Sequence, residues 1–159
     1  MDGAFTIRSL NGGREFTVGI HIVDVSQFVE IGDLIDNDAK RRTTSFYPAT
    51  ESKVYHMLPE RLSTYIVSLK EGKDRHVLSL FLNIDHGGNI GVVQNPKRAI
   101  IRNDHELTYK EAQDIINTAK YKPPEISNSL ESSVFNMHLL AEKIRSKRIK
   151  EGQHFFPER

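Results

Sequence analysis

The stretch Thr17 to Thr44 contains the residues whose types and spacing could do chemistry. An alternating strand ends at Asp24, and the chain turns at Gly32 and passes three further aspartates before the basic triplet Lys40-Arg41-Arg42. Carboxylates and guanidinium groups this close together could hold both a divalent cation and a phosphate backbone. They are equally compatible with an ordinary solvated turn.

A metal site would draw on aspartates at strand ends. Asp2 lies immediately before one predicted strand, and Asp24 ends the adjacent strand of the same predicted hairpin. Mg²⁺ prefers oxygen ligands and retained water, so aspartates at one strand edge could hold it. Aspartates at strand ends are also common turn formers. The seven histidines are scattered without metal-ligand spacing, and no sequence motif for nucleophilic catalysis is present.

Basic and aromatic residues meet at Lys40 to Tyr47, in the sequence KRRTTSFY. Cations that follow phosphates, next to rings that stack on bases, are what a single-stranded nucleic-acid groove requires. The alternative is the C-terminus of a helix that continues into a packed loop. A second basic run, Lys143 to Lys150, lies in the second half of the last predicted helix, and such a run more often forms a solvated face.

These residues must be positioned by a small set of predicted elements. Ala4 to Arg8 and Arg14 to Val23 alternate around Asn11-Gly12-Gly13, which predicts a β-hairpin with Val18, Ile20 and Ile22 on one face. Arg75 to Asp85 and Ile90 to Gln94 predict a second hairpin, and Pro96 interrupts its partner strand before Ala99 to Arg102.

Three helices are predicted in addition to a short one starting near Pro59. Ile35 to Arg42 has aspartates at its N-terminus and cations at its C-terminus, as the helix dipole prefers. Thr108 to Glu111 is a capping box for a helix that reaches about Lys120. A last helix runs from about Ser129 to Lys150, with Leu130, Val134, Met137, Ala141, Ile144 and Arg148 spaced three and four apart.

Length and composition indicate one soluble intracellular domain with a real core. The chain has 159 residues, 38% of them hydrophobic, and its formal net charge is +1. Nucleic-acid affinity must therefore come from local patches. The absence of cysteine excludes disulfides and thiolate zinc sites. No apolar run reaches membrane-spanning length, so no membrane partner is expected.

Four segments, in order, resemble the ribonuclease II/R family, which includes the catalytic exoribonuclease of the eukaryotic exosome. HIVDVSQFVEIGDLIDNDAKRRTTSFY resembles the family's HIADVSHFV…G…LD…A…RRGTSVYL, and HMLPERLSTYIVSL resembles IPMLPE.LS..LCSL. ELTYKEAQDII resembles the LTY.EAQ helix start, and LLAEKIRSKRIKEG resembles LA..LR..R...G. The likeness extends over essentially the whole chain.

The resemblance implies a processive 3′→5′ exoribonuclease that hydrolyses single-stranded RNA with two Mg²⁺ ions. Asp2 matches the first aspartate of a DD pair in the family's metal cluster, which makes it the candidate catalytic and metal-binding residue, and Gly3 stands where the second aspartate belongs. The resemblance makes Arg41, Phe46 and Tyr109 RNA contacts. Phe46 replaces a tyrosine that stacks on the base nearest the scissile end, and Arg42 replaces a glycine.

The family pattern is incomplete in residues 1–159. The earlier metal aspartates, the later H.TSPIRRY segment with its catalytic arginine, and the flanking RNA-binding domains have no counterpart. The resemblance thus implies the N-terminal half of the catalytic domain, which would work with the remaining half and with other RNA-binding domains. Alone it should hydrolyse little or nothing, because one aspartate cannot anchor two ions. The alternative is a degenerate ribonuclease-like module that binds RNA or protein within a larger protein.

The predicted fold is α+β. A mainly antiparallel sheet is built from the two hairpins and packed by the C-terminal helices. The strand Val18 to Ile22 should then lie beneath the metal site, and Asp24 should be structural.

Overall fold

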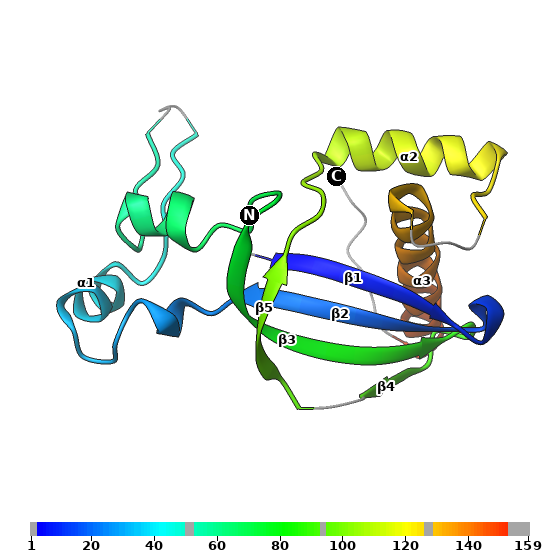
Figure 1. The fold of residues 1–159 in the computed structure, drawn as a ribbon, viewed down its shortest axis with the longest axis horizontal. Helices are drawn as coiled ribbons and strands as arrows, with labels where there is room; N and C mark the ends of the chain where they lie inside the picture. Colours follow the sequence, from blue (N-terminus) through cyan, green and yellow to red (C-terminus); the bar gives the residue numbers. More distant parts are fainter. Residues whose placement is uncertain (1–2, 50–52, 93–94, 126–128, 153–159) are drawn as a thin grey trace. The chain divides into compact units, whose positions relative to one another are not determined.

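The computed structural model describes residues 3–49, 53–92, 95–125 and 129–152. It contains a five-stranded sheet and three α-helices in the order β1, β2, α1, β3, β4, β5, α2, α3 (Figure 1). The strands are β1 (Gly3–Leu10), β2 (Glu15–Val23), β3 (Asp74–Asp85), β4 (Ile90–Val92) and β5 (Lys97–Arg102). The α-helices are α1 (Leu34–Arg42), α2 (Tyr109–Tyr121) and α3 (Leu130–Lys150). The α+β prediction is confirmed.

Both predicted hairpins form. β1 pairs with β2, and the connection through Asn11 and Gly12 takes positive φ values of 50° and 68°, which asparagine and glycine tolerate best. β3 pairs antiparallel with β4 in the register Leu82↔Val92 and Ile84↔Ile90. β5 also pairs with β3, so the interruption at Pro96 divides one predicted partner strand into two.

The chain divides into two compact units. The first consists of residues 1–4, 21–78 and 98–104, and the second of residues 5–20, 79–97 and 105–159. Each unit has its own apolar cluster. In the first unit the buried members are Val23, Leu62, Val67, Leu69 and Val77. In the second they are Phe16, Val18, Ile84 and Leu140.

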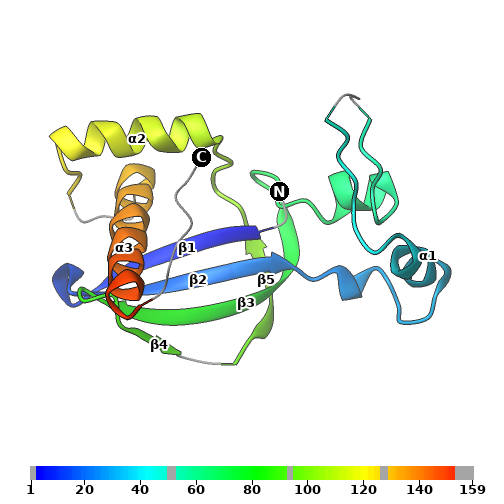
Figure 2. The same cartoon turned by 180° about the vertical axis from the view of Figure 1, so that it is seen from behind.

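In the second unit, α3 supplies the helical side of the core. Leu140 is 3% exposed, and Met137 and Ile144 pack against the same cluster. α2 packs against α3, as Figures 1 and 2 both show. The predicted apolar stripe of α3 is partly wrong, because Ala141 is exposed and Leu140 is the buried residue. The predicted capping box of Thr108 and Glu111 forms, and Ser129, the predicted start of the last helix, is the N-cap of α3.

Val18, Ile20 and Ile22 share one face of β2, as the alternation predicts, but this face is not buried along its whole length. Val18 is buried, but Ile22 is 57% exposed, and the buried residues near the end of β2 are instead His21 and Val23. Alternate residues of a strand point to opposite faces, so the burial changes from even-numbered to odd-numbered positions within β2.

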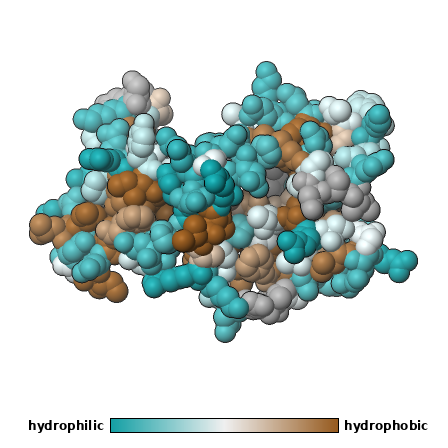
Figure 3. Space-filling view, in the orientation of Figure 1, coloured by the Kyte–Doolittle hydropathy of each residue, from teal (hydrophilic) through white to brown (hydrophobic). Residues whose placement is uncertain are grey.

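In the first unit, the segment after Pro59 forms a short π-helix, η3 (Leu62–Ile66), where the sequence predicted a short helix. Leu62 from this segment packs into the core of the unit. Apolar side chains also reach the surface, with Ile31 96% and Leu34 89% exposed. Figure 3 shows hydrophobic residues on the surface over the part of the unit that contains α1. Among the described helices, none is both long and apolar enough to span a lipid bilayer.

Candidate nucleic-acid interface

The basic end of α1 is built by local interactions. Asp33 caps the helix by accepting a hydrogen bond from the Asp36 backbone N–H at 2.6 Å. Lys40 pairs with Asp36 one turn earlier, and Arg41 and Arg42 pair with Asp38 at 2.7 and 2.8 Å. Because all three cations remain at least half exposed, these pairs hold them in place without removing them from solvent.

The two acidic partners both have lowered pKa values. The hydrogen bond from Lys40 lowers the pKa of Asp36, and the hydrogen bonds from Arg42 and Arg41 lower the pKa of Asp38. A phosphate that approaches Arg41 must therefore compete with a carboxylate. Exposed ion pairs contribute little stability, so this competition is weak.

The chain leaves α1 by a sharp change of direction at Thr43. Thr43 has a φ of 61°, and its N–H donates to the Ala39 carbonyl at 2.8 Å. Ser45 Oγ then accepts the Met57 N–H at 2.9 Å. Phe46 and Tyr55 form an isolated antiparallel bridge, with both backbone hydrogen bonds at 2.8 and 2.9 Å. These contacts hold the segment after α1 beside the segment that leads to η3.

An exposed aromatic group results from this bridge. The Phe46 and Tyr55 rings lie 6.3 Å apart between centroids at an interplanar angle of 39°, and they are 61% and 45% exposed. Tyr47 is 70% exposed, and Lys53 Nζ lies 5.5 Å from the Tyr55 ring centroid. Rings open to solvent beside cations can stack on bases while the cations attract phosphates. We call Lys40–Arg42, Phe46, Tyr47, Lys53 and Tyr55 the aromatic-basic surface.

Sequence reasoning found part of this surface. Arg41, Phe46 and Tyr47 were recognised, and the structure brings Arg41 and Phe46 into the same unit. Tyr55 and Lys53 were missed. An aromatic residue nine positions after Phe46, across a segment with Pro48, was the available signal for a cross-strand ring pair.

Tyr109, the third predicted RNA contact, lies in the second unit. It is the first residue of α2, and its side chain is 98% exposed. The capping box fixes the start of the helix at this residue, and the ring is exposed to solvent. Tyr109 and the aromatic-basic surface are thus two separate features, one in each unit.

The predicted metal residue Asp2 lies outside the described residues. Asp24, as expected, has a structural environment: its carboxylate accepts hydrogen bonds from Ser26 and Gln27 and pairs with Arg98 at 3.1 Å. Within the described residues, no three His, Cys, Asp or Glu side chains gather closely enough to hold a metal ion. The described donors therefore do not fit a Mg²⁺ pair by themselves.

His21 and Gly3 complete the strand-end region. His21 is 2% exposed, and burial lowers its pKa, because desolvation favours the neutral ring over the charged one. Gly3 does not have a positive φ, and a Cβ placed there would lie 3.5 Å from the His21 carbonyl oxygen, an ordinary contact. The backbone thus does not require glycine at the position where the family pattern has an aspartate.

The basic run of α3 is more than a solvated face. Lys143 Nζ lies 2.9 Å from His86 Nδ1, and Lys147 donates to Asn89 Oδ1 at 2.7 Å. Both contacts join the helix to the turn between β3 and β4, so these two lysines have a structural role.

Comparison with known proteins places this arrangement in a family. The RNB domain family model matches residues 1–159. The chain belongs to the RNB domain family. Ribonuclease R of Thermotoga maritima is 34% identical over 158 residues, which cover 95% of this chain and 20% of that protein. An Arabidopsis thaliana relative named inactive exonuclease DIS3L2 is 34% identical over 161 residues, which cover 96% of this chain and 15% of the relative.

A solved structure gives the same assignment. Mycoplasma genitalium RNase R in complex with double-stranded RNA matches with a TM-score of 0.79 and 25% identity, covering 97% of this chain and 26% of that one. This RNB chain spans a fifth or less of the length of these relatives.

Proposed function

We propose that this RNB chain is the first part of a 3′→5′ exoribonuclease-type domain and that its aromatic-basic surface binds single-stranded RNA. The observation that carries the proposal is the exposed Phe46 ring, held beside Tyr55 and near the cationic end of α1. Phe46 stacks on a base, and Arg41 contacts the phosphate backbone. Tyr109 supplies a further RNA contact from the second unit.

Support comes from two independent directions. RNB relatives bear the names ribonuclease R and exonuclease, and the RNase R neighbour was solved with RNA. The surface itself combines stackable rings with cations in the way sequence-tolerant binding to single strands needs. An RNA ligand also implies a site of action inside the cell.

Mg²⁺ belongs to the proposal only through Asp2 and carboxylates from elsewhere in the domain. When bound, a pair of such ions stabilises the attacking and leaving oxygens of phosphodiester hydrolysis. The described residues of this chain bind and orient RNA, and no step of hydrolysis is assigned to them. We propose that residues 1–159 alone bind RNA without degrading it.

Binding is tested by the fluorescence anisotropy of a 5′-labelled single-stranded oligonucleotide titrated with the chain. Phe46→Ala should weaken binding about tenfold, because one stacked base contributes roughly 1–3 kcal/mol. Phe46→Tyr should retain the affinity, because the ring face is kept. Tyr121→Ala is the matched control, since it removes a ring that is 93% exposed at the end of α2. Equal losses for the two alanine variants would contradict the proposal.

Hydrolysis is tested on the same oligonucleotide with Mg²⁺ present. No mononucleotide should appear. Steady release that is lost on Asp2→Asn would overturn the proposed inactivity of the isolated chain.

A second candidate, a degenerate module that binds RNA or protein without catalysis in its parent protein, is favoured by one observation. Gly3 replaces a metal carboxylate although the backbone does not require glycine there. The name of the Arabidopsis thaliana relative, inactive exonuclease DIS3L2, supports this candidate. Gly3→Asp should then raise Mn²⁺ binding, measured by electron paramagnetic resonance. Unchanged binding would remove the support that Gly3 gives to this second candidate.

A further inference from the structure

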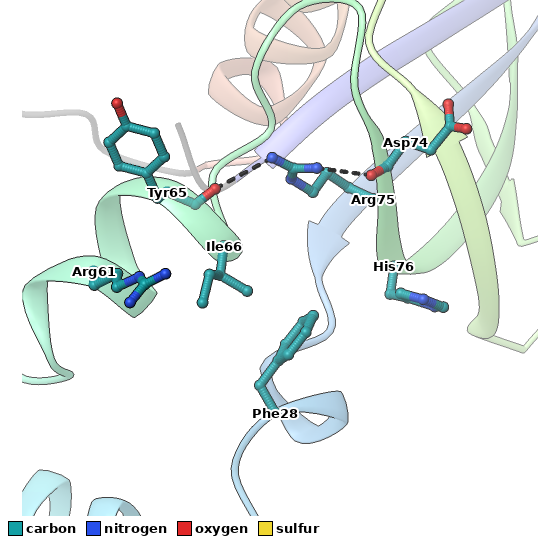
Figure 4. Close-up of a pocket in the computed structure, with 7 residues that line it drawn as sticks. All are labelled: Phe28, Arg61, Tyr65, Ile66, Asp74, Arg75 and His76. Carbon is teal, nitrogen blue, oxygen red and sulfur yellow. Dashed lines mark hydrogen bonds between the residues drawn. The ribbon is translucent and has the colours of Figure 1, made fainter.

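A cavity of about 660 Å³ lies in the first unit, apart from the residues of the aromatic-basic surface. Three segments line it (Figure 4). Phe28 follows the short 3₁₀ helix Val25–Gln27, Arg61 precedes η3, Tyr65 and Ile66 end it, and Arg75 and His76 lie at the start of β3. A cavity of this size matches those that hold whole small ligands rather than single ions.

Arg75 is the central cation of this cavity. Its guanidinium extends from β3 toward η3 and donates to three backbone carbonyls, those of Ser68, Asp74 and Tyr65, at 3.0, 2.9 and 3.2 Å. A guanidinium has five N–H donors, so two remain. Within the described residues no carboxylate pairs with Arg75. Its half-buried charge therefore rests on neutral acceptors alone.

The surrounding charges leave the cavity positive. The Asp74 carboxylate is the acidic group at its edge, and it lies 3.9 Å from Arg102. Arg61 is exposed and forms no ion pair or side-chain hydrogen bond with the described residues, and in Figure 4 its guanidinium points toward Ile66. Two guanidinium groups without carboxylate partners favour a phosphate, which each can bind by two parallel N–H donors.

The remaining wall is apolar, formed by Phe28 and Ile66. Phe28 is 43% and Ile66 38% exposed, and Figure 4 shows the Phe28 ring directed toward Ile66 and β3. The Tyr65 ring is partly occupied, because Lys70 Nζ lies 4.2 Å from its centroid. Phe28 is thus the ring available to stack on a ligand. Inorganic phosphate would leave this wall unused, whereas a nucleotide combines a planar base with a phosphate.

We infer that this cavity binds a nucleoside 5′-monophosphate unit, with the base against Phe28 and Ile66 and the phosphate at Arg61 and the free donors of Arg75. The unit is either a free mononucleotide or the 5′-phosphorylated end of an RNA strand. The inference does not rest on the proposed RNA surface. Phe46→Ala should leave nucleotide binding unchanged, so the two proposals can fail separately.

Isothermal titration of the chain with adenosine 5′-monophosphate at low ionic strength tests the inference. Arg61→Gln should weaken binding about tenfold through the loss of charge-assisted hydrogen bonds. Phe28→Ala should weaken it about as much through the loss of stacking. Arg61→Lys should give an intermediate loss, because the charge stays and the planar fork is removed. Circular dichroism of each variant checks that the fold is retained.

Matched controls are available on exposed positions outside the cavity. Lys73→Gln changes the net charge by the same amount as Arg61→Gln. Phe5→Ala removes an exposed ring from β1. Both variants should bind the nucleotide as the wild type does. A 5′-phosphorylated tetranucleotide compared with its 5′-hydroxyl form identifies the source when both are titrated into the Phe46→Ala variant, in which the aromatic-basic surface contributes little binding. Binding of the phosphorylated strand alone indicates an RNA end, and binding of adenosine 5′-monophosphate indicates a free nucleotide.

Four results would overturn the inference. The first is that the chain binds adenosine as tightly as adenosine 5′-monophosphate, and the second is that it binds inorganic phosphate as tightly as the monophosphate. The third is that Arg61→Gln and Phe28→Ala both leave the affinity unchanged. The fourth is that neither phosphorylated probe binds at millimolar concentration.

Discussion

The carboxylate of Asp24 has a structural role. Its side chain is 10% exposed, and it is held by Ser26, Gln27 and Arg98. Its backbone N–H donates to the His76 carbonyl at 3.0 Å, which joins the end of β2 to the start of β3. The hydrogen bond from Ser26, assisted by the hydrogen bond from Gln27 and the positive charge of Arg98, outweighs desolvation and holds the pKa of Asp24 below its usual value.

Asp24→Asn should therefore destabilise the chain by about 1.5 kcal/mol at pH 7, the lower range for hydrogen bonds to a charged group. A group whose folded-state pKa is lowered stabilises the fold above its unfolded pKa of about 3.9 and loses this contribution as the pH falls through the folded value. The difference between wild type and variant should thus shrink below pH 4. Urea denaturation at pH 7 and pH 3 measures it.

Asp104→Asn is the control for this prediction. Asp104 is exposed in the same unit, and its side chain has no ion pair or hydrogen bond with the described residues, so its substitution should change stability by less than about 0.5 kcal/mol. A loss for Asp24→Asn that stays constant between pH 7 and pH 3 would show that the effect does not come from the charge.

Single residues were predictable where their role depends on local sequence. The basic triplet and Phe46 follow from their order along the chain and from the family resemblance. Tyr55 was not predictable in the same way, because its contact with Phe46 depends on the left-handed backbone at Thr43 and on the bond between Ser45 and Met57. A threonine in the sequence does not predict a left-handed backbone, and a serine does not predict which distant N–H it will accept.

At the scale of elements, helix starts were the most predictable features. Asp33, Thr108 and Ser129 accept hydrogen bonds from the backbone N–H three residues later, so the signal and its effect lie within one turn. The buried face of β2 was not predictable. Between Val18 and His21 its buried positions change from even-numbered to odd-numbered residues, because the two ends of the strand pack into different apolar clusters. The alternation of a single strand cannot predict that a second cluster exists.

The contact of the β3–β4 turn with α3 gives an element-scale prediction. Gly88 is buried with a φ of 77°, and a Cβ there would lie 3.2–3.3 Å from backbone atoms of Lys143 and Ile144. Gly88→Ala should destabilise the chain through both the left-handed backbone and this clash, since helix backbone cannot move aside cheaply. Thermal or urea unfolding should reveal the loss of stability. The contact of Lys143 with His86 should also be lost.

Gly12→Ala separates the two causes. Gly12 has a φ of 68° but open space where a Cβ would lie, so alanine meets only the conformational penalty of about 1–2 kcal/mol. Gly88→Ala should cost about 1–3 kcal/mol more than Gly12→Ala. Equal losses would mean that the turn is not pressed against α3 in solution.

At the scale of the whole molecule, the charge is almost balanced. The formal net charge is +1, with 22 basic and 21 acidic residues, so long-range attraction cannot supply RNA affinity. Affinity must arise where cations are concentrated. The two candidates along the chain are the end of α1 and the second half of α3, and Lys143 and Lys147 of the latter already bind the β3–β4 turn. The end of α1 is therefore the favoured electrostatic contact.

The salt dependence of RNA binding distinguishes these two locations. For single strands, the slope of log affinity against log salt is roughly −0.7 for each phosphate neutralised, so the three cations of α1 imply a slope of about −2. Arg41→Gln should reduce the slope by about 0.7, and Lys110→Gln, at an exposed position of α2, should leave it unchanged. Asp38→Asn should increase affinity at low salt, because Arg41 and Arg42 lose the carboxylate that competes with phosphate. A slope much steeper than −2 that does not respond to Arg41→Gln would move the electrostatic contact from α1 to α3.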